Sequence, residues 1–303
     1  MATITNFKDQ WLNEYYEIYV AAHSYEPVSY QRFLRNTVLL KDFDENSFFT
    51  AVEEDAPIGF IYAPQRDGTG FITMLSVKSG HDIAAIGGML LDRALEYHEA
   101  AGLKSLTTGY FPIYINQGHA DSETDYVQLF RDRGFRETES VSRKLMLSER
   151  EHYGNIEEIR ERLKGEGIYV GELRPEYVRS FLDPNAPFSS ESWAFEFRSR
   201  LENKLDFTSV HVAAVDGKVI GACIFSDPNS DDMRFGPYGV NPEYQGRGIG
   251  KVLLEDTLSE MESRGLKYAW MQWTPKSGAA SFLYEKFGFK ILQNYMTFYK
   301  KIQ

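Results

Sequence analysis

An internal repeat constrains the fold of this chain more than any other feature of its sequence. Residues 77–104 and 240–267 align without a gap at a constant offset of 163 residues, and both segments begin with valine and end with Gly-Leu-Lys. Further on, residues 129–135 align with residues 283–289 at an offset of 154, so the first half carries about nine extra residues, which we place within 111–125. Two copies of one fold, arranged end to end, are the simplest interpretation.

The second copy carries a strand, a glycine-rich turn and a helix within residues 238–264. Pro242 ends the strand, since proline has no N–H to donate to a sheet. Leu254, Leu258 and Met261 then recur at the i, i+4, i+7 spacing of an amphipathic helix. Three glycines lie within six residues just before this helix. Because N–H groups at a helix start have no partner inside the helix, bare backbone there predicts a cradle for a phosphate or diphosphate.

The spacing within this turn excludes two common nucleotide-binding motifs. The phosphate-binding loop G-x-x-x-x-G-K-[ST] fails because Gln245 replaces its first glycine and Val252 its Ser/Thr. The dinucleotide fingerprint G-x-G-x-x-G fails at Lys251. The pattern [QR]-x-x-G-x-[GA] does fit, as Gln245, Gly248 and Gly250. Placed between a strand and a long amphipathic helix, it resembles the acetyl-CoA motif of the GNAT acetyltransferases; the alternative is a helix start that only tolerates glycines.

A second segment extends this resemblance. Residues 279–289 look like the late segment A-x-x-x-Y-x-x-x-G-F of the family, whose tyrosine is often the general acid that protonates the departing CoA thiolate. Tyr284 stands at that position, which also suits a core aromatic of an amphipathic helix. Family members often carry asparagine three residues before the alanine of this segment, Ala280 here, and this chain has Ser277.

The resemblance implies acetyl transfer from acetyl-CoA to an amine by direct attack. It places the diphosphate on the glycine turn, the pantetheine along the end of the preceding strand, and the thioester oxygen at the Val240 N–H. The residues that we expect to bind acetyl-CoA are Tyr238, Gly239, Val240, Gln245, Gly246, Arg247, Gly248, Ile249, Gly250, Lys251, Ser277 and Ala280. Tyr284 is the expected catalytic residue. No acidic residue lies within 233–240, so the sequence names no general base.

The first copy lacks the residues that would hold a diphosphate. Ile83 and Ala85 add side chains where the second copy has glycine. Asp82 would place negative charge beside the phosphates, which is unfavourable. Phe130, which has no proton to give, stands where the second copy has Tyr284. We therefore expect a degenerate copy that keeps the fold but does not bind acetyl-CoA.

The predicted fold class is α+β, with two tandem GNAT-like domains, each a mixed, mostly antiparallel sheet flanked by helices. We expect a degenerate domain over residues 1–149, a linker over 150–167 and an acetyl-CoA-binding domain over 168–303. The linker contains a charged helical stretch at 155–164, for which a simple spacer is the favoured interpretation.

Composition narrows the range of partners. The chain has 33 Lys and Arg against 44 Asp and Glu, a net charge of −11, which argues against nucleic-acid binding. No apolar stretch reaches the ~18 residues of a membrane span, and no signal peptide is recognised, so we expect a cytoplasmic protein without membrane contact. Cys223 lies in an apolar run and is expected to be buried rather than nucleophilic. The six histidines show no metal-ligand spacing, and no metal is expected.

The sequence thus predicts an N-acetyltransferase that uses acetyl-CoA and acts on a primary amine, with a small molecule as the favoured acceptor. One alternative is acetylation of a protein lysine or N-terminus. Another is a non-catalytic acyl-CoA-binding module. The aromatic stretch 183–197, expected to form one wall of the acceptor site, does not identify the acceptor, and homo-oligomer formation stays open.

Overall fold

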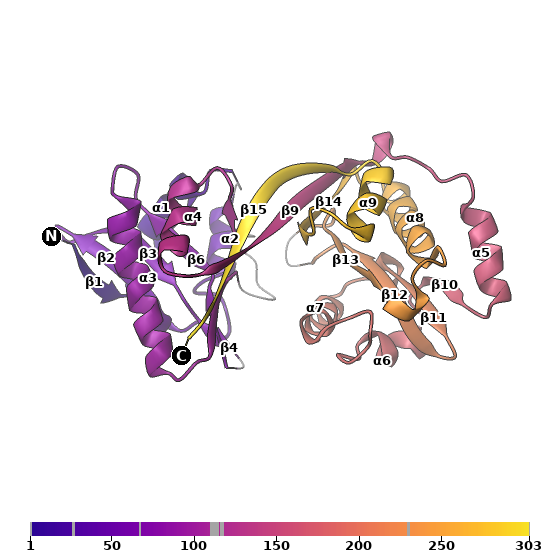
Figure 1. The fold of residues 1–303 in the computed structure, drawn as a ribbon, viewed down its shortest axis with the longest axis horizontal. Coiled ribbons are helices and arrows are strands. Elements are labelled where there is room, and N and C mark those ends of the chain that lie inside the picture. Colours follow the sequence, from indigo (N-terminus) through magenta and orange to yellow (C-terminus); the bar gives the residue numbers. More distant parts are fainter. Residues whose placement is uncertain are drawn as a thin grey trace. The chain divides into compact units, whose positions relative to one another are not determined.

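The chain folds into two compact units that each repeat the same arrangement of sheet and helices (Figure 1). The computed structural model describes residues 2–25, 28–66, 68–109, 115, 118–228 and 231–302. Unit 1 comprises Met1–Ser140 with Gln293–Gln303, and unit 2 comprises Val141–Leu292. Part of the segment 111–125, where the sequence placed the extra residues of the first half, lies outside the described residues.

Unit 1 is built on a four-stranded antiparallel sheet with helices on both faces. Its strands, in spatial order, are β1 (Thr3–Asn6), β2 (Phe48–Glu53), β3 (Ala56–Tyr62) and β6 (Met74–Val77). Its helices are α1 (Leu12–Ala22), α2 (Tyr30–Arg35), α3 (Ile83–Ala100) and α4 (Thr124–Asp132). Because side chains alternate along a strand, Phe49 packs in the same cluster as Leu90 of α3, whereas Phe48 packs in the cluster of Tyr15 of α1.

Most of the C-terminal strand, from Gln293 onward, belongs to unit 1, whereas the sequence placed all of it in the second domain. The other strands with residues in this unit are β4 (Gln65–Arg66), β5 (Thr69–Ile72), β7 (Ser105–Thr108), β8 (His119–Ala120), β9 (Arg136–Met146) and β15 (Lys290–Lys301). β15 pairs with β7 and β8, and Phe298 stacks on Phe130 of α4 with ring centroids 4.5 Å apart. The expected boundary of 168–303 therefore differs from the compact unit, because these contacts lie far from β15 in sequence.

Unit 2 repeats the sheet of unit 1 in the same order. Its strands are β10 (Tyr169–Glu172), β11 (Val210–Val215), β12 (Lys218–Phe225) and β13 (Phe235–Val240), with β14 (Tyr268–Thr274) paired to β9. Its helices are α5 (Ile156–Gly165), α6 (Val178–Phe181), α7 (Glu191–Glu202), α8 (Ile249–Ser263) and α9 (Ala279–Lys286). The correspondence of β2, β3, β6 and α3 with β11, β12, β13 and α8 confirms the tandem repeat and the mostly antiparallel α+β fold.

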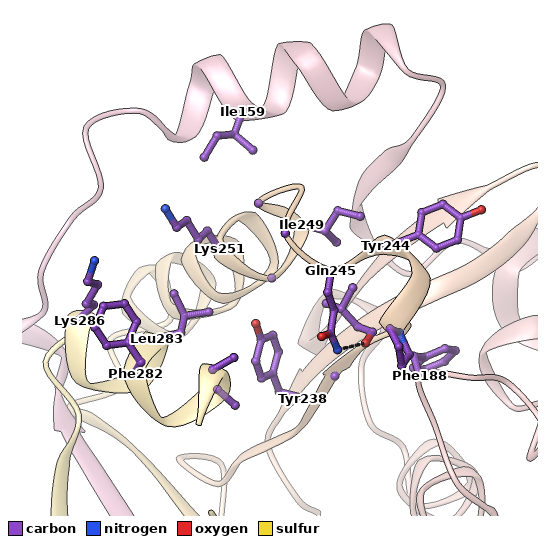
Figure 2. A pocket seen from close by; sticks show the side chains of 18 of the residues that line it. Ile159, Phe188, Tyr238, Tyr244, Gln245, Ile249, Lys251, Phe282, Leu283 and Lys286 are labelled. Atoms are coloured by element: carbon purple, nitrogen blue, oxygen red, sulfur yellow. Dashed lines mark hydrogen bonds between the residues drawn. The ribbon is translucent and has the colours of Figure 1, made fainter. Parts of the chain in front are cut away.

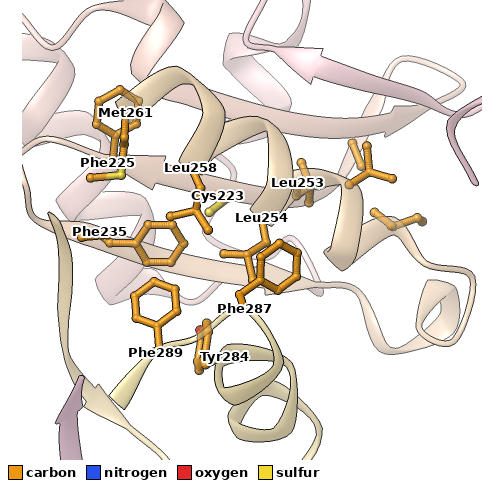
Figure 3. Close-up of a cluster of buried hydrophobic side chains, with 14 of the residues drawn as sticks. Cys223, Phe225, Phe235, Leu253, Leu254, Leu258, Met261, Tyr284, Phe287 and Phe289 are labelled. Atoms are coloured by element: carbon orange, nitrogen blue, oxygen red, sulfur yellow. The ribbon is translucent and has the colours of Figure 1, made fainter. Parts of the chain in front are cut away.

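The core of unit 2 holds α8 against its sheet and against α9 (Figure 3). Leu254 and Leu258, two residues of the predicted apolar stripe, are fully buried with Phe235 of β13. Cys223 is also fully buried in this cluster, and burial raises the pKa of its thiol. The cysteine is therefore a core residue, as expected from its apolar surroundings. The start of α8 is fixed in place by this packing.

The stretch expected to be a linker is instead part of unit 2. It forms α5, in which Ile159 and Leu163 belong to the core cluster that includes α8, and Ile156 is buried as well. Arg160 also donates to Asp256 of α8, with Nη2 2.6 Å from Oδ1. The spacer interpretation was wrong because the three apolar residues fall on one helical face, which the surrounding charges obscured.

Short 3-10 turns connect several of these elements: η1 (Asp9–Trp11), η2 (Glu45–Ser47), η3 (Leu147–Glu149), η4 (Pro175–Tyr177), η5 (Phe207–Ser209) and η6 (Pro242–Tyr244). None of the described helices combines the length and the apolar character needed to cross a bilayer.

Candidate active site

The turn between β13 and α8 presents main-chain N–H groups that the protein does not use. Gly246 and Gly248 have φ angles of +80° and +84°, a region that glycine adopts with little strain. Gly248 is the N-cap of α8, and no side chain caps this helix start. No described residue accepts a hydrogen bond from any of the five amides at 246–250. An anion can bind these donors without displacing an internal partner.

A cavity of about 940 Å³ opens at this turn (Figure 2). The sequence-predicted residues that line it are Tyr238, Gly239, Val240, Gln245, Gly246, Gly248, Ile249, Gly250, Lys251 and Ala280. Arg247, Ser277 and Tyr284 were expected at the same site, but none of the three lines the cavity. Its volume is in the range of pockets that hold drug-sized ligands and cofactors.

Pro187 and Phe188 belong to the stretch 183–197 that was expected to form one wall of the acceptor site. The other lining residues escaped the sequence analysis: Asn155, Glu158, Ile159, Arg162, Pro242, Tyr244, Ala279, Phe282, Leu283 and Lys286. Four of these come from α5 or the residue before it. Ile159 lies directly over the turn, since a Cβ built on Gly248 would be 2.8 Å from its Cγ2 atom. Arg162 donates to the main-chain oxygen of Arg247 at 2.6 Å, and Arg247 pairs with Glu166. Helix α5 therefore forms one wall of the site. The sequence signal for this role was the apolar face formed by Ile156, Ile159 and Leu163.

Three cations surround the cavity without a carboxylate partner among the described residues. They are Arg162, Lys251 and Lys286, none of which forms an ion pair with a described residue. Lys251 lies over the Tyr153 ring at 5.1 Å and Lys286 over the Phe282 ring at 4.3 Å. In a chain with a net charge of −11, three such cations beside unused amides favour an anionic ligand.

The end of β13 offers a second set of backbone donors and acceptors. β13 is an edge strand of its sheet. The Asn241 N–H donates to Ile220 of β12 at 2.7 Å. Since consecutive N–H groups alternate in direction, the Val240 N–H points away from β12. The Val240 carbonyl accepts from the Gln245 side chain at 3.1 Å (Figure 2), so this glutamine holds the turn against the strand.

Tyr284 lies in the hydrophobic core next to the cavity rather than on its wall. Its side chain is only 5% exposed and packs with Phe287 and Phe289 (Figure 3). Its ring centroid is 5.8 Å from that of Tyr238, which does line the cavity. Burial raises the pKa of both phenols, so both are protonated at neutral pH.

In unit 1, side chains of the protein accept hydrogen bonds from the N–H groups that correspond to the unused ones of unit 2. The Asp82 carboxylate accepts from the Ala85 N–H at 3.1 Å and caps the start of α3. Val77 corresponds to Val240, and its N–H donates to the phenol oxygen of Tyr126 at 2.8 Å. Two of the donors that are unused in unit 2 are thus satisfied internally in unit 1.

Alanine substitutions at two glycines of the turn test the contact with α5. Gly246 and Gly248 have nearly the same φ, and this conformation costs an alanine roughly 1–2 kcal/mol. A Cβ on Gly246 would meet open space, whereas a Cβ on Gly248 would clash with Ile159. We expect Gly248→Ala to lower the free energy of unfolding more than Gly246→Ala, as measured by urea denaturation. Adding Ile159→Ala should reduce the difference, and equal losses in the two single variants would contradict this contact.

Comparison with known proteins places both units in one family. A family model described as "Acetyltransferase (GNAT) family" matches residues 8–111, and one described as "Acetyltransferase (GNAT) domain" matches residues 206–291. Curated relatives include the [Ribosomal protein bS18]-alanine N-acetyltransferases of Escherichia coli (strain K12) and Salmonella typhimurium (strain LT2), each 41% identical over 59 residues. That match covers 18% of this chain and 40% of each relative.

Solved structures share the fold of the whole chain. A GCN5-related glucosamine N-acetyltransferase region of a fungal multi-domain GH3 beta-N-acetylglucosaminidase superposes with a TM-score of 0.81 at 17% identity, covering 99% of this chain and 38% of that one. A GCN5-related N-acetyltransferase from Sphaerobacter thermophilus gives 0.71 at 17% identity, covering 100% and 96%. A tandem GNAT protein from the clavulanic acid biosynthesis pathway gives 0.64 at 13% identity, covering 100% and 99%.

Proposed function

Because this chain belongs to the GNAT superfamily as a tandem-domain member, we propose that unit 2 binds acetyl-CoA and transfers its acetyl group to a primary amine. The observation that carries the proposal is the turn at 246–250, whose amides have no acceptor among the described residues and border a cavity of about 940 Å³. A diphosphate supplies the acceptors that these amides lack. Arg162, Lys251 and Lys286 supply positive charge for the phosphates of CoA.

The edge of β13 is the proposed site of the pantetheine arm. Its amides would pair with the backbone at Tyr238, Gly239 and Val240, in the manner of an added strand. The Val240 N–H would then donate to the thioester oxygen, which becomes negative in the transition state. Gln245 supports this arrangement by holding the Val240 carbonyl.

The proposed reaction is a direct transfer. The neutral amine nitrogen attacks the thioester carbon, the carbonyl oxygen takes up negative charge, and the C–S bond breaks as the C=O bond re-forms. The amine loses one proton and the CoA thiolate gains one, which leaves the acetylated amine and free CoA. An alkylammonium with a pKa of ~10.4 must lose a proton before it attacks, whereas the leaving thiol has a pKa of ~8.5. Among the described residues, 233–240 carry no acidic side chain, so deprotonation through water is the proposed route.

We assign acetyl-CoA to unit 2 alone. In unit 1, Tyr126 and Asp82 already accept from the amides that correspond to the proposed sites. Binding there would have to break these hydrogen bonds and leave a buried phenol without its partner. This arrangement supports a degenerate first copy.

The stoichiometry of CoA tests the cradle and its absence from unit 1. We expect one acetyl-CoA per chain in isothermal titration calorimetry. Gly248→Trp should abolish binding because an indole would fill the turn. Gly217→Trp is the matched control, since Gly217 also has a positive φ, +74°, but lies in the β11–β12 turn, where a Cβ would meet open space. Two bound molecules, or unchanged affinity in Gly248→Trp, would refute the assignment.

Tyr284 is the proposed general acid, although its side chain is buried beside the cavity rather than on its wall. Tyr284→Phe should lower kcat more than it weakens binding of acetyl-CoA, because only the proton donor is removed. Tyr238→Phe is the comparison variant, since Tyr238 lies on the cavity wall beside it. If only Tyr238→Phe lowers kcat, the proton comes from the wall residue, and Tyr284 serves in packing.

A small-molecule primary amine is the favoured acceptor, and the N-terminus of a protein is the second candidate. The second candidate is supported by the names of the curated relatives, which act on the alanine of a ribosomal protein. Their similarity covers only 59 residues.

Release of the CoA thiol with a panel of amines decides between these functions. The panel comprises an aminosugar, alkylamines, an alanine-leading peptide and a lysine-containing peptide with a blocked N-terminus. We expect thiol release with a small amine, and faster release with the alanine-leading peptide would favour the second candidate. Binding of acetyl-CoA without turnover of any acceptor would indicate a non-catalytic binding module.

A further inference from the structure

Two histidines and a glutamate meet inside unit 1, far from the proposed CoA cavity in sequence. His23 ends α1, His119 lies in β8, and Glu123 precedes α4. The Nδ1 atom of His23 is 2.9 Å from one carboxylate oxygen of Glu123, and the Nδ1 atom of His119 is 3.1 Å from the other. One potential ligand atom from each residue lies within 4.8 Å of the other two. Both histidines are buried, and the Glu123 side chain is 10% exposed.

The contacts of His23 cannot all be satisfied by a neutral imidazole. Its Nε2 atom is 3.1 Å from the Leu75 main-chain oxygen, which can only accept. If Nε2 carries the hydrogen, the lone pair of Nδ1 faces the Glu123 oxygen. If Nδ1 carries it, the lone pair of Nε2 faces the Leu75 oxygen, even though the Ser76 hydroxyl, 3.0 Å away, can donate there. Each tautomer leaves two acceptors in contact, which a cation at Nδ1 or a second proton on the ring would relieve.

The negative charge of Glu123 also favours a positive charge in this cluster. The hydrogen-bond partners of its carboxylate among the described residues are the two histidines and the Ala120 N–H. No lysine or arginine in the described part of the chain forms an ion pair with it. A largely buried carboxylate needs a positive partner, and here only the imidazoles or a bound cation can provide it.

We propose that His23, His119 and Glu123 bind a divalent transition-metal ion, with Zn²⁺ as the ion that this donor set suits. Two imidazoles and one carboxylate are established zinc ligands and leave one position of a tetrahedral ion open. The Leu75 oxygen on the far nitrogen of His23 matches the outer-shell acceptor that orients metal-bound histidines. The ion would join α1, β8 and the start of α4.

The cluster lies beside the blocked amide of unit 1. The ring of His119 stacks on that of Tyr126, with centroids 4.9 Å apart and an interplanar angle of 13°. Tyr126 is the residue that accepts from the Val77 N–H. A metal here would therefore stabilise the packing that fills the site in the first copy. No metal was expected from the spacing of the histidines. That spacing could not indicate this site, because His23 is 96 positions from His119 in the sequence.

Metal analysis of the full-length protein tests the site. The wild type is stripped with EDTA, dialysed against ZnCl₂ and analysed by inductively coupled plasma mass spectrometry, with Kd measured by competition against a zinc indicator. We expect one Zn²⁺ per chain. Glu123→Gln and His23→Gln should each weaken binding by more than the roughly 10- to 100-fold typical of losing an outer-shell partner. His98→Gln, at a buried histidine of unit 1 outside the cluster, should bind zinc like the wild type.

A Co²⁺ spectrum of the wild type keeps the test valid if a variant fails to fold, as judged by circular dichroism. We expect the visible d–d bands of a four-coordinate site without thiolate charge transfer, since Cys223 is buried in unit 2. Absence of stoichiometric metal in the folded wild type, or zinc affinity unchanged in folded Glu123→Gln and His23→Gln, would overturn the proposal.

Discussion

The difference between the two helix starts governs the rest of this structure. Both α3 and α8 follow the edge strand of a four-stranded sheet, and both begin with N–H groups that the helix cannot satisfy. Asp82 caps α3, whereas Gly248 starts α8 without a side-chain cap. An uncapped helix start costs stability that a ligand can restore. An anion bound at the start of α8 would therefore stabilise the fold, whereas Asp82 already caps the start of α3.

The packing around the turn holds its unused donors in place. Leu254 and Leu258 anchor α8 on the sheet, and Gln245 ties the turn to the end of β13. Helix α5 adds a wall, with Ile159 over Gly248. Two features thus favour glycine at position 248: its positive φ and the closeness of Ile159. The turn is held by its surroundings and still leaves its amides accessible to the cavity.

The sequence predicted the repeat, the strand–turn–helix and ten of the 22 residues that line the cavity, because these depend on local patterns. It did not predict what depends on distant contacts. β15 pairs with strands of unit 1 through hydrogen bonds that its own residues do not encode. Helix α5 has only three apolar residues among many charges, so it looked like a spacer. Tyr284 matched a motif that fixes its place along the helix but not its exposure to the cavity.

Few side chains distinguish the filled turn of the first copy from the open turn of the second. The alignment indicated that Asp82 would oppose phosphate, but it did not reveal Tyr126, which corresponds to Ala280 in the second copy. A phenol at that position reaches the Val77 N–H and closes the edge of β6, whereas alanine leaves the corresponding edge of β13 open. One large residue therefore both fills the space and satisfies the donor. Because a filled site needs no ligand to satisfy its amides, the first copy is free to gain stability from internal contacts that a binding site cannot have.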